Sequence, residues 1–247
     1  MYILPPIEKI FVFKSDIVVK RMPDEAREFT PGLRSEVAEF SFSSRRKLAF
    51  VAANTDVVFR TMITLTYPRE FETDGSVVKR HLRAFLQYMR RVDVDADYLW
   101  FLEFQRRGAP HIHLLSSIMS RSVKKTDVSR RWYKIVSSGD RRHLRAGTRV
   151  EAIRKTGGGA RYAVKYALKM YQKVVPVGYR DVGRFWGHSR GVRPSVRAIY
   201  RVRNDEQLRL YLLRWLEVAG KGLDYSVLFG AAPYLERARG GVGIVSD

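Results

Sequence analysis

The clearest elements of the chain follow from where apolar side chains recur. Residues 57–67 are rich in β-branched side chains and end at Pro68, which predicts a strand. Between residues 76 and 91 apolar side chains recur every three or four positions, which predicts an amphipathic helix with its Arg and Lys side chains in solvent. Residues 98–104 and 111–118 predict two further strands.

Weaker patterns surround these elements. Residues 7–22 and 36–53 alternate loosely between polar and apolar side chains, which favours strands. Residues 124–135 predict a charged helix, residues 139–149 a basic loop, and residues 187–194 another loop.

Two more helices are expected in the second half of the chain. The first covers residues 160–172 after the glycine-rich segment 156–159, and the second covers residues 205–218. The last 17 residues are expected to be frayed. The order of strand, helix, hairpin and helices predicts an α+β fold around a central antiparallel sheet.

Two histidines stand two positions apart on one predicted strand. The side chains of His111 and His113 therefore point to the same face. Residues 106–108 suit a three-residue hairpin loop that ends on a left-handed glycine. This loop pairs Glu103 with His111 and Phe101 with His113, and a slip of one residue would send Glu103 to the other face.

Two imidazoles and one carboxylate on one sheet face form a ligand set for a divalent metal ion. Such a set leaves coordination positions open for water and for substrate oxygens, which favours Lewis-acid chemistry. Mg²⁺ is abundant, whereas imidazole ligands suit Mn²⁺ better, so either ion is expected. The alternative is an ordinary strand that carries two surface histidines. The remaining histidines, His81, His143 and His188, are expected to have surface roles without a metal.

A second candidate group lies on the predicted helix over residues 160–172. Tyr162 and Tyr166 are four positions apart and share a helical face, with Lys165 and Lys169 on a neighbouring face. A separate apolar stripe on this helix leaves both phenols free of core packing. Because a phenol has a pKa near 10, a nucleophilic tyrosine needs a cation nearby, which either lysine can supply. The alternative is that both rings belong to the core.

The charge balance indicates a polyanionic partner. The chain has 46 Lys and Arg against 25 Asp and Glu, a formal net charge of +21, and 33 of the basic residues are Arg. Guanidinium groups bind phosphate in a bidentate way and stack on exposed bases. The pattern favours a nucleic-acid partner but does not separate an enzyme from a ribosomal-type RNA-binding protein, and a generally arginine-rich surface is a further alternative.

Composition also excludes several classes. With no cysteine, disulfides, thiolate catalysis and cysteine-bound zinc are excluded. There is no GxxxxGK[ST] phosphate loop. No apolar run reaches the length of a membrane span, and the first residues do not resemble a signal peptide, so an intracellular soluble protein is expected.

Three segments, taken in chain order, resemble the rolling-circle replication initiators of the HUH endonuclease superfamily. They are ITLTYP (63–68), GAPHIHLL (108–115) and YAVKYALK (162–169). The paired tyrosines are similar to those of the two-tyrosine replication proteins of small single-stranded DNA phages and certain plasmids. The segment RFWGHSRG (184–191) is similar to one that follows the tyrosine helix in such phage proteins. The resemblance covers about residues 57–190.

The resemblance implies a fold and a domain order. It implies an antiparallel sheet with flanking helices, of the ferredoxin-like or RRM-like kind, as the nickase domain over residues 56–200. Residues 1–55 are then an N-terminal β-rich extension, and residues 201–247 a C-terminal helix and flexible tail. One departure from the family pattern is Ile112, the apolar residue between the two histidines.

The resemblance also implies a nick-and-rejoin reaction. His111 and His113 bind the metal ion with Glu103 as the acidic ligand, and a tyrosine attacks phosphorus to give a 5′-phosphotyrosine and a free 3′-hydroxyl. Tyr166 is the preferred first nucleophile and Tyr162 the alternate. Two tyrosines allow a second cut after one round of replication, so that a circle is resealed.

The implied partners are single-stranded DNA with an origin hairpin, a host helicase and a host polymerase. No membrane partner is expected, and the expected location is the cytoplasm, that of the host cell if a phage encodes the protein. The oligomeric state is left open. Candidate DNA contacts are Arg106, Arg107, Arg161, Arg184, Trp186 and Arg190. Two alternatives remain: a transposase with the same chemistry, or a DNA- or RNA-binding protein without catalysis.

Overall fold

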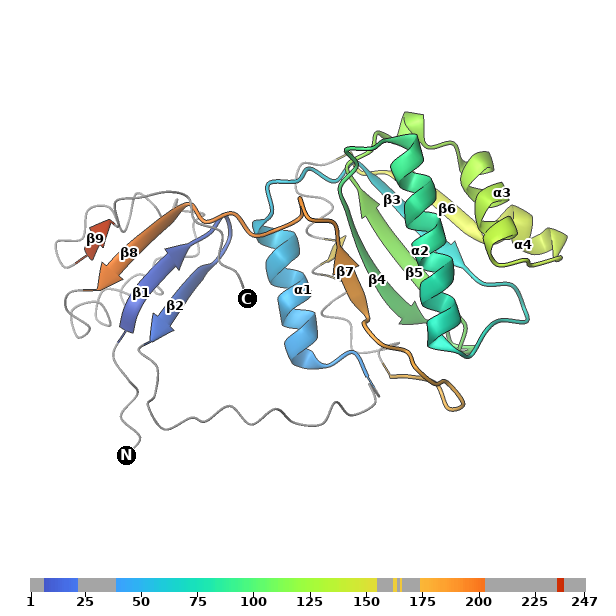
Figure 1. Ribbon diagram of the computed structural model, residues 1–247, viewed down its shortest axis with the longest axis horizontal. Coiled ribbons are helices and arrows are strands. Elements are labelled where there is room, and N and C mark those ends of the chain that lie inside the picture. Colours follow the sequence, from blue (N-terminus) through green and yellow to red (C-terminus); the bar gives the residue numbers. More distant parts are fainter. Residues whose placement is uncertain are drawn as a thin grey trace. The chain divides into compact units, whose positions relative to one another are not determined.

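The computed structural model describes residues 7–21, 39–154, 162, 163, 165, 174–202 and 235–237. The chain divides into two compact units (Figure 1). Arg34–Arg193 form the larger unit, and Met1–Leu33 with Pro194–Asp247 form the smaller one. The predicted roles of segments 1–55, 56–200 and 201–247 stay predictions.

The smaller unit contains a four-stranded sheet in the order β2-β1-β8-β9. Its strands are β1 (Ile7–Val12), β2 (Ile17–Arg21), β8 (Ala198–Val202) and β9 (Leu235–Arg237). Each neighbouring pair is antiparallel. The strands predicted over residues 7–22 are confirmed as the β1–β2 pair.

The larger unit is built on a five-stranded sheet in the order β6-β3-β5-β4-β7. Its strands are β3 (Thr61–Thr66), β4 (Tyr98–Phe104), β5 (Pro110–Ser116), β6 (Thr148–Ala152) and β7 (Trp186–His188). All pairings are antiparallel, and β5 lies at the centre between β3 and β4. The three strands that the sequence predicted most clearly are the three central ones. The predicted α+β fold class is confirmed.

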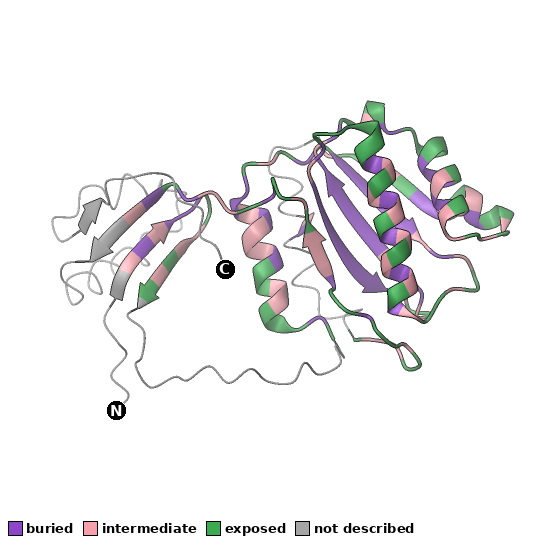
Figure 2. Ribbon diagram, in the orientation of Figure 1, coloured by how far each residue is buried: buried purple, intermediate pink, exposed green. Residues whose placement is uncertain are grey.

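Helices cover this sheet. They are α1 (Phe42–Asn54), α2 (Gly75–Val92), the short 3-10 helix η1 (Ser120–Ser122), α3 (Lys125–Ile135) and α4 (Arg141–Ala146). Figure 2 shows that α2 carries its buried residues on one side, toward strands β4 and β5, which are themselves buried. The helices predicted over 76–91 and 124–135 are confirmed.

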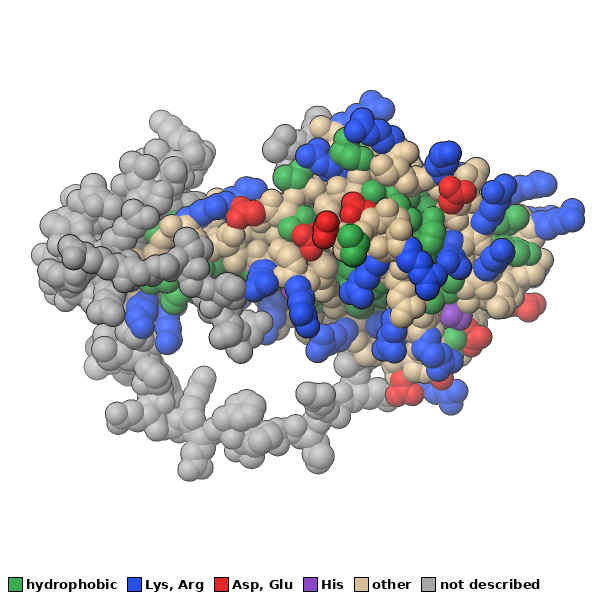
Figure 3. Space-filling model, turned by 45° about the horizontal axis from the view of Figure 1, so that its top comes forward, with side chains coloured by type: hydrophobic (Ala, Val, Ile, Leu, Met, Phe, Trp, Pro, Cys, Tyr) green, Lys and Arg blue, Asp and Glu red, His purple; other side chains and the backbone are tan. Residues whose placement is uncertain are grey.

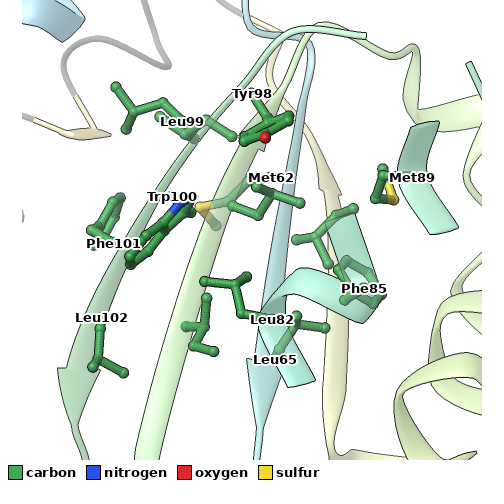
Figure 4. Packing of buried hydrophobic residues seen from close by; sticks show 14 of the residues in the cluster. Met62, Leu65, Leu82, Phe85, Met89, Tyr98, Leu99, Trp100, Phe101 and Leu102 are labelled. Atoms are coloured by element: carbon green, nitrogen blue, oxygen red, sulfur yellow. The ribbon is translucent and has the colours of Figure 1, made fainter. Parts of the chain in front are cut away.

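The apolar side of α2 makes much of the core. Asp74 caps the helix by accepting a hydrogen bond from the Ser76 amide at 2.8 Å. Leu82, Phe85 and Met89 recur at helical spacing and belong to the buried cluster that also contains strand residues (Figure 4). This packing covers one face of the sheet and leaves the other face for the candidate site.

One predicted strand is wrong. Within residues 36–53 the structure forms helix α1, which Ser41 caps by accepting a hydrogen bond from the Ser44 amide at 3.3 Å. Leu48 and Ala52, four positions apart, are the buried apolar residues of this helix. The segment is rich in Ala, Leu, Arg and Lys, which are good helix formers, and this propensity prevails over a loose alternation.

Two predicted loops are also wrong in part. Residues 139–149 contain helix α4, which Asp140 caps, and the start of strand β6, which pairs with β3. Residues 187–194 begin with the end of strand β7, which pairs with β4. Both strands lie at the edges of the sheet, and their pairing with distant residues stabilises them without a marked alternation of side chains.

Several predictions fall outside the described residues. Within the predicted helix over 160–172 only Tyr162, Ala163 and Lys165 are described, and they are helical. The predicted helix over 205–218 and most of the last 17 residues lie outside. Among the described residues, no helix is long and apolar enough to cross a membrane.

Candidate active site

The hairpin that joins β4 to β5 has the predicted turn. Gln105 donates its amide hydrogen to the Ala109 carbonyl at 2.9 Å, and Gly108 has a left-handed φ of 81°. Side chains other than glycine rarely adopt this conformation. The register is also as predicted, since Glu103 pairs with His111 and Phe101 with His113. The carboxylate and both imidazoles therefore lie on one face of the sheet.

These three side chains are close together and shielded from solvent. Glu103 and His113 are 1% and 3% exposed, and Glu103 Oε2 lies 3.5 Å from His113 Nε2. The rings of His111 and His113 meet edge to face, with centroids 4.5 Å apart. Phe101 stacks on His113 with centroids 5.0 Å apart, which fixes that imidazole from the side of β4.

Two threonines of β3 contact the histidines from the other side. Thr64 pairs with His113 and Thr66 with His111 in the β3–β5 ladder. In each pair the threonine Oγ1 lies 3.2 Å from the histidine Nδ1. A hydroxyl on Nδ1 orients the ring and directs Nε2 toward the site. The sequence prediction missed this role, although the spacing of two between the threonines matches that of the histidines.

Burial keeps His111 neutral. Loss of solvation lowers its pKa to about 4, the nearby His113 and Arg107 lower it further, and Glu103 opposes the shift. At neutral pH the imidazole therefore carries a lone pair, which a metal ligand requires. Gln105 Nε2 lies 3.4 Å from the same Nδ1 that Thr66 contacts.

The donor set fits a divalent metal ion in kind. It offers two imidazoles and a carboxylate on one buried sheet face, with hydroxyls behind the rings. As they lie, no three His, Asp or Glu side chains in the described part of the chain already form a closed metal-binding group. A bound ion therefore has to draw Glu103, His111 and His113 closer together.

Tyr162 lies beside this group. Its ring centroid is 6.1 Å from that of His113, and the two rings meet edge to face. Tyr162 is half-buried and packs against the hydrophobic core, so the expectation that its phenol is free of packing is wrong. Lys165, three positions on, is exposed. Tyr166, Lys169 and Arg161 lie outside the described residues.

The predicted DNA contacts fall into two groups. Arg106, Arg184 and Arg190 are exposed. Arg107 is also exposed, but its guanidinium donates to the carbonyls of Tyr67, Pro68 and Arg69 at 2.6, 2.7 and 3.2 Å. These bonds hold the loop after β3 beside the hairpin. A structural role therefore accounts for Arg107, and its contact with DNA stays a prediction.

Trp186 and one unexpected arginine share the face of the site. Trp186 pairs with Phe101 in the β4–β7 ladder, and Arg149 pairs with Thr64 in the β3–β6 ladder. Arg149 is exposed and forms an ion pair with Glu151 at 2.8 Å. The sequence prediction missed Arg149 because residues 139–149 were expected to be a loop, and only strand pairing assigns this side chain to a face.

Two further histidines are not surface residues as expected. His143 is 6% exposed, and its Nε2 lies 2.7 Å from the Thr66 carbonyl. The Tyr67 hydroxyl lies 3.0 Å from His81 Nδ1. Both histidines stabilise the end of β3, next to the candidate site. His188 is exposed, as expected.

The larger unit has a basic surface around this site. Figure 3 shows Lys and Arg side chains spread over its visible face, with few acidic side chains among them. Such a surface attracts a polyanion and makes its binding sensitive to salt.

One comparison with known families gives a match. Residues 60–171, a little under half of the 247 residues, match the model of a replication-associated protein family, the ORF2 type. The matched segment begins just before β3 and contains Glu103, His111, His113 and both candidate tyrosines. No curated protein shows significant similarity to the chain.

Proposed function

Residues 60–171 of this chain belong to the ORF2-type replication-associated protein family, and we propose that the chain initiates replication by nicking single-stranded DNA with a tyrosine. The cut leaves a 5′-phosphotyrosine and a free 3′-hydroxyl, and a later transfer rejoins the strand ends. The 3′-hydroxyl primes a host polymerase, while a host helicase opens the duplex at an origin hairpin.

A single arrangement carries this proposal. Glu103, His111 and His113 lie on one sheet face, and the phenol-bearing ring of Tyr162 lies against that face, 6.1 Å from the His113 ring. A candidate nucleophile beside a carboxylate and two imidazoles is the arrangement that a phosphoryl transfer needs, because this reaction depends on alignment and charge neutralisation.

Glu103, His111 and His113 are the residues that would hold Mn²⁺ or Mg²⁺. A divalent ion bound there neutralises charge on the scissile phosphate and polarises it toward attack. The protein's own contribution is to keep His111 neutral through burial and to orient both rings from Thr64 and Thr66.

The tyrosine step balances as an exchange of esters. The phenolic oxygen bonds to phosphorus while the bond from phosphorus to the 3′-oxygen breaks. The phenol loses its proton, and the departing 3′-oxygen gains one to become the hydroxyl. Lys165 and Lys169 supply positive charge that favours the ionised phenol. Tyr166 is our preferred first nucleophile, and Tyr162 makes the second cut.

The test is the covalent adduct itself. The full chain is mixed with Mn²⁺ and a library of single-stranded oligonucleotides, and the products are separated on a denaturing gel. We expect an adduct that is lost in chelator and in the Tyr162→Phe/Tyr166→Phe double variant. Each single variant then shows which tyrosine cuts first. Tyr133→Phe, a tyrosine of α3 outside the site, is the matched control and should keep the adduct.

Two outcomes would reject the proposal. An adduct that persists in the double variant excludes these tyrosines as nucleophiles. Tight, salt-sensitive binding of oligonucleotides with no adduct under any condition indicates a binding protein without catalysis.

A further inference from the structure

An aromatic side chain stands exposed at the start of α1. Phe42 is the first residue of this helix and is 63% exposed, whereas Leu48 and Ala52 supply the buried apolar contacts of the helix. The ring is therefore not needed for the core. An exposed ring of this size is an available surface for stacking.

Two guanidinium groups lie over this ring. The Cζ atoms of Arg45 and Arg46 are 5.7 and 5.9 Å from the Phe42 ring centroid. Lys47 follows and is exposed. The thirteen residues of α1 contain no Asp or Glu, so the helix carries three positive charges, and the nearest acidic residues along the chain are Glu39 and Asp56. We call Phe42, Arg45, Arg46 and Lys47 the α1 surface.

The α1 surface is continuous with the candidate active site. On the same helix, Ser44 accepts a hydrogen bond from Trp186 Nε1 at 2.9 Å. Trp186 is the β7 residue that pairs with Phe101, the ring that stacks on His113. It also stacks on the exposed His188, with ring centroids 5.8 Å apart. A row of rings therefore leads along the sheet face from the histidines to the helix.

We propose that the α1 surface binds single-stranded DNA outside the cleavage site, with a base stacked on Phe42 and the adjoining phosphates on Arg45 and Arg46. The combination of an exposed ring with guanidinium groups matches an unpaired strand, because a duplex keeps its bases stacked on one another and offers none to Phe42. This proposal deepens the proposed function, on which it rests, by extending the DNA contact beyond the segment matched by the family.

The test measures DNA binding without cleavage. A labelled oligo-dT is titrated with the full chain in chelator, and fluorescence anisotropy is recorded over a series of salt concentrations. We expect Phe42→Ala to weaken binding by about five- to tenfold, the lower part of the range for loss of one stacked base. Phe42→Tyr keeps a ring and should bind as the wild type does.

The charges are tested separately. Arg45→Ala/Arg46→Ala should lower the slope of log affinity against log salt by about 1.4, or about 0.7 for each lost phosphate contact to a single strand. The matched control is Arg141→Ala/Arg142→Ala, an exposed arginine pair of α4, which packs beside β6 at the opposite edge of the sheet from β7. This control should leave the affinity of Phe42-dependent binding unchanged.

The adduct assay with Mn²⁺ is run in parallel, so that the two proposals fail separately. If the wild type forms the adduct but the α1 variants bind oligo-dT as tightly as it does, the α1 surface is not a DNA site while the nickase proposal stands. If the variants lose affinity for duplex DNA and not for the single strand, the proposal is overturned in favour of a duplex contact. If binding depends on Phe42 but no adduct forms, the α1 surface stands and the nicking chemistry fails.

Discussion

At the scale of single residues, the candidate site depends on what lies behind the histidines. Each imidazole has a threonine hydroxyl at 3.2 Å from Nδ1, and the ring of His113 also stacks on Phe101. These contacts fix the orientation of both rings before any ligand arrives. The free energy of metal binding then need not include the ordering of the ligand side chains.

We therefore expect Thr64→Val/Thr66→Val to weaken Mn²⁺ binding by about tenfold, since removal of a hydrogen bond behind a metal ligand commonly costs 10- to 100-fold. Isothermal titration measures the affinity, and ¹⁵N NMR of the metal-free protein shows whether the protonated ring nitrogen changes. Thr64→Ser/Thr66→Ser keeps both hydroxyls and should bind as the wild type does. Equal affinity in the valine variant would refute the positioning role.

The lowered pKa of His111 predicts a pH-dependent stability. In the unfolded chain this imidazole takes up a proton near pH 6.5, whereas in the folded protein it does so only near pH 4. As pH falls below 6.5 the unfolded state binds more protons than the folded state, so the free energy of unfolding decreases until about pH 4.

Urea unfolding of the metal-free protein at pH 7 and pH 5 measures this effect. His111→Asn keeps a side-chain group near Thr66 but does not titrate, so the variant should lose about 2 kcal/mol less than the wild type over this interval. His81 and His143, whose pKa values are also lowered by burial, contribute equally in both proteins. An identical loss in wild type and variant would show that His111 does not stay neutral in the folded state.

At the scale of the elements, the start of α2 is the tightest junction in the larger unit. Gly75 donates its amide hydrogen to the Arg180 carbonyl at 2.9 Å, and Asp74 forms an ion pair with Arg180 at 3.2 Å. A Cβ atom on Gly75 would come within 2.4 Å of the Asp181 carbonyl oxygen and of the Val182 Cα. Both are backbone atoms, so a side-chain rotation cannot relieve the contact.

Gly75→Ala should therefore lower the free energy of unfolding by about 2 kcal/mol, as overpacking of a tight site does. Thermal and urea unfolding give the value. Gln87→Ala changes an exposed position of the same helix and should stay within about 0.5 kcal/mol of the wild type. If Gly75→Ala is as stable as this control, the segment after residue 174 does not pack on α2 as described.

At the scale of the whole molecule, the hydrophobic core belongs to one unit. The buried cluster runs from Phe40 to Val192, all within Arg34–Arg193. A unit with its own core is expected to fold by itself. The candidate site and the α1 surface both lie in this unit.

A fragment of residues 34–193 should therefore unfold cooperatively on heating and bind Mn²⁺ as the full chain does. Differential scanning calorimetry and near-ultraviolet circular dichroism check this expectation. Leu114→Ala in the fragment removes a fully buried side chain of β5 and should cost about 2–5 kcal/mol, which tests that the core is specifically packed. A fragment with no cooperative transition would mean that the rest of the chain is required for the fold.

Local signals were sufficient for the centre of the larger unit. The loop ending on Gly108 sets the hairpin register, and the register puts Glu103 on the face of His111 and His113, because antiparallel partners share a face. The apolar spacing of α2 predicts its buried side for the same reason: the periodicity of an element is written in its own residues.

Only the tertiary structure could decide the rest. β6 and β7 are strands because β3 and β4 offer them hydrogen-bonding edges, so neither Arg149 nor Trp186 could be assigned to a face from its neighbours in the chain. The contacts of Thr64 and Thr66 with the histidines, and of Ser44 with Trp186, join residues 45 to 142 positions apart. The sequence by itself determined the central hairpin, the main helix and the donor set, because these depend on local spacing. The neutral state of His111, the setting of Tyr162 and the link from the site to α1 depend on burial and long-range packing, which exist only once the chain has folded.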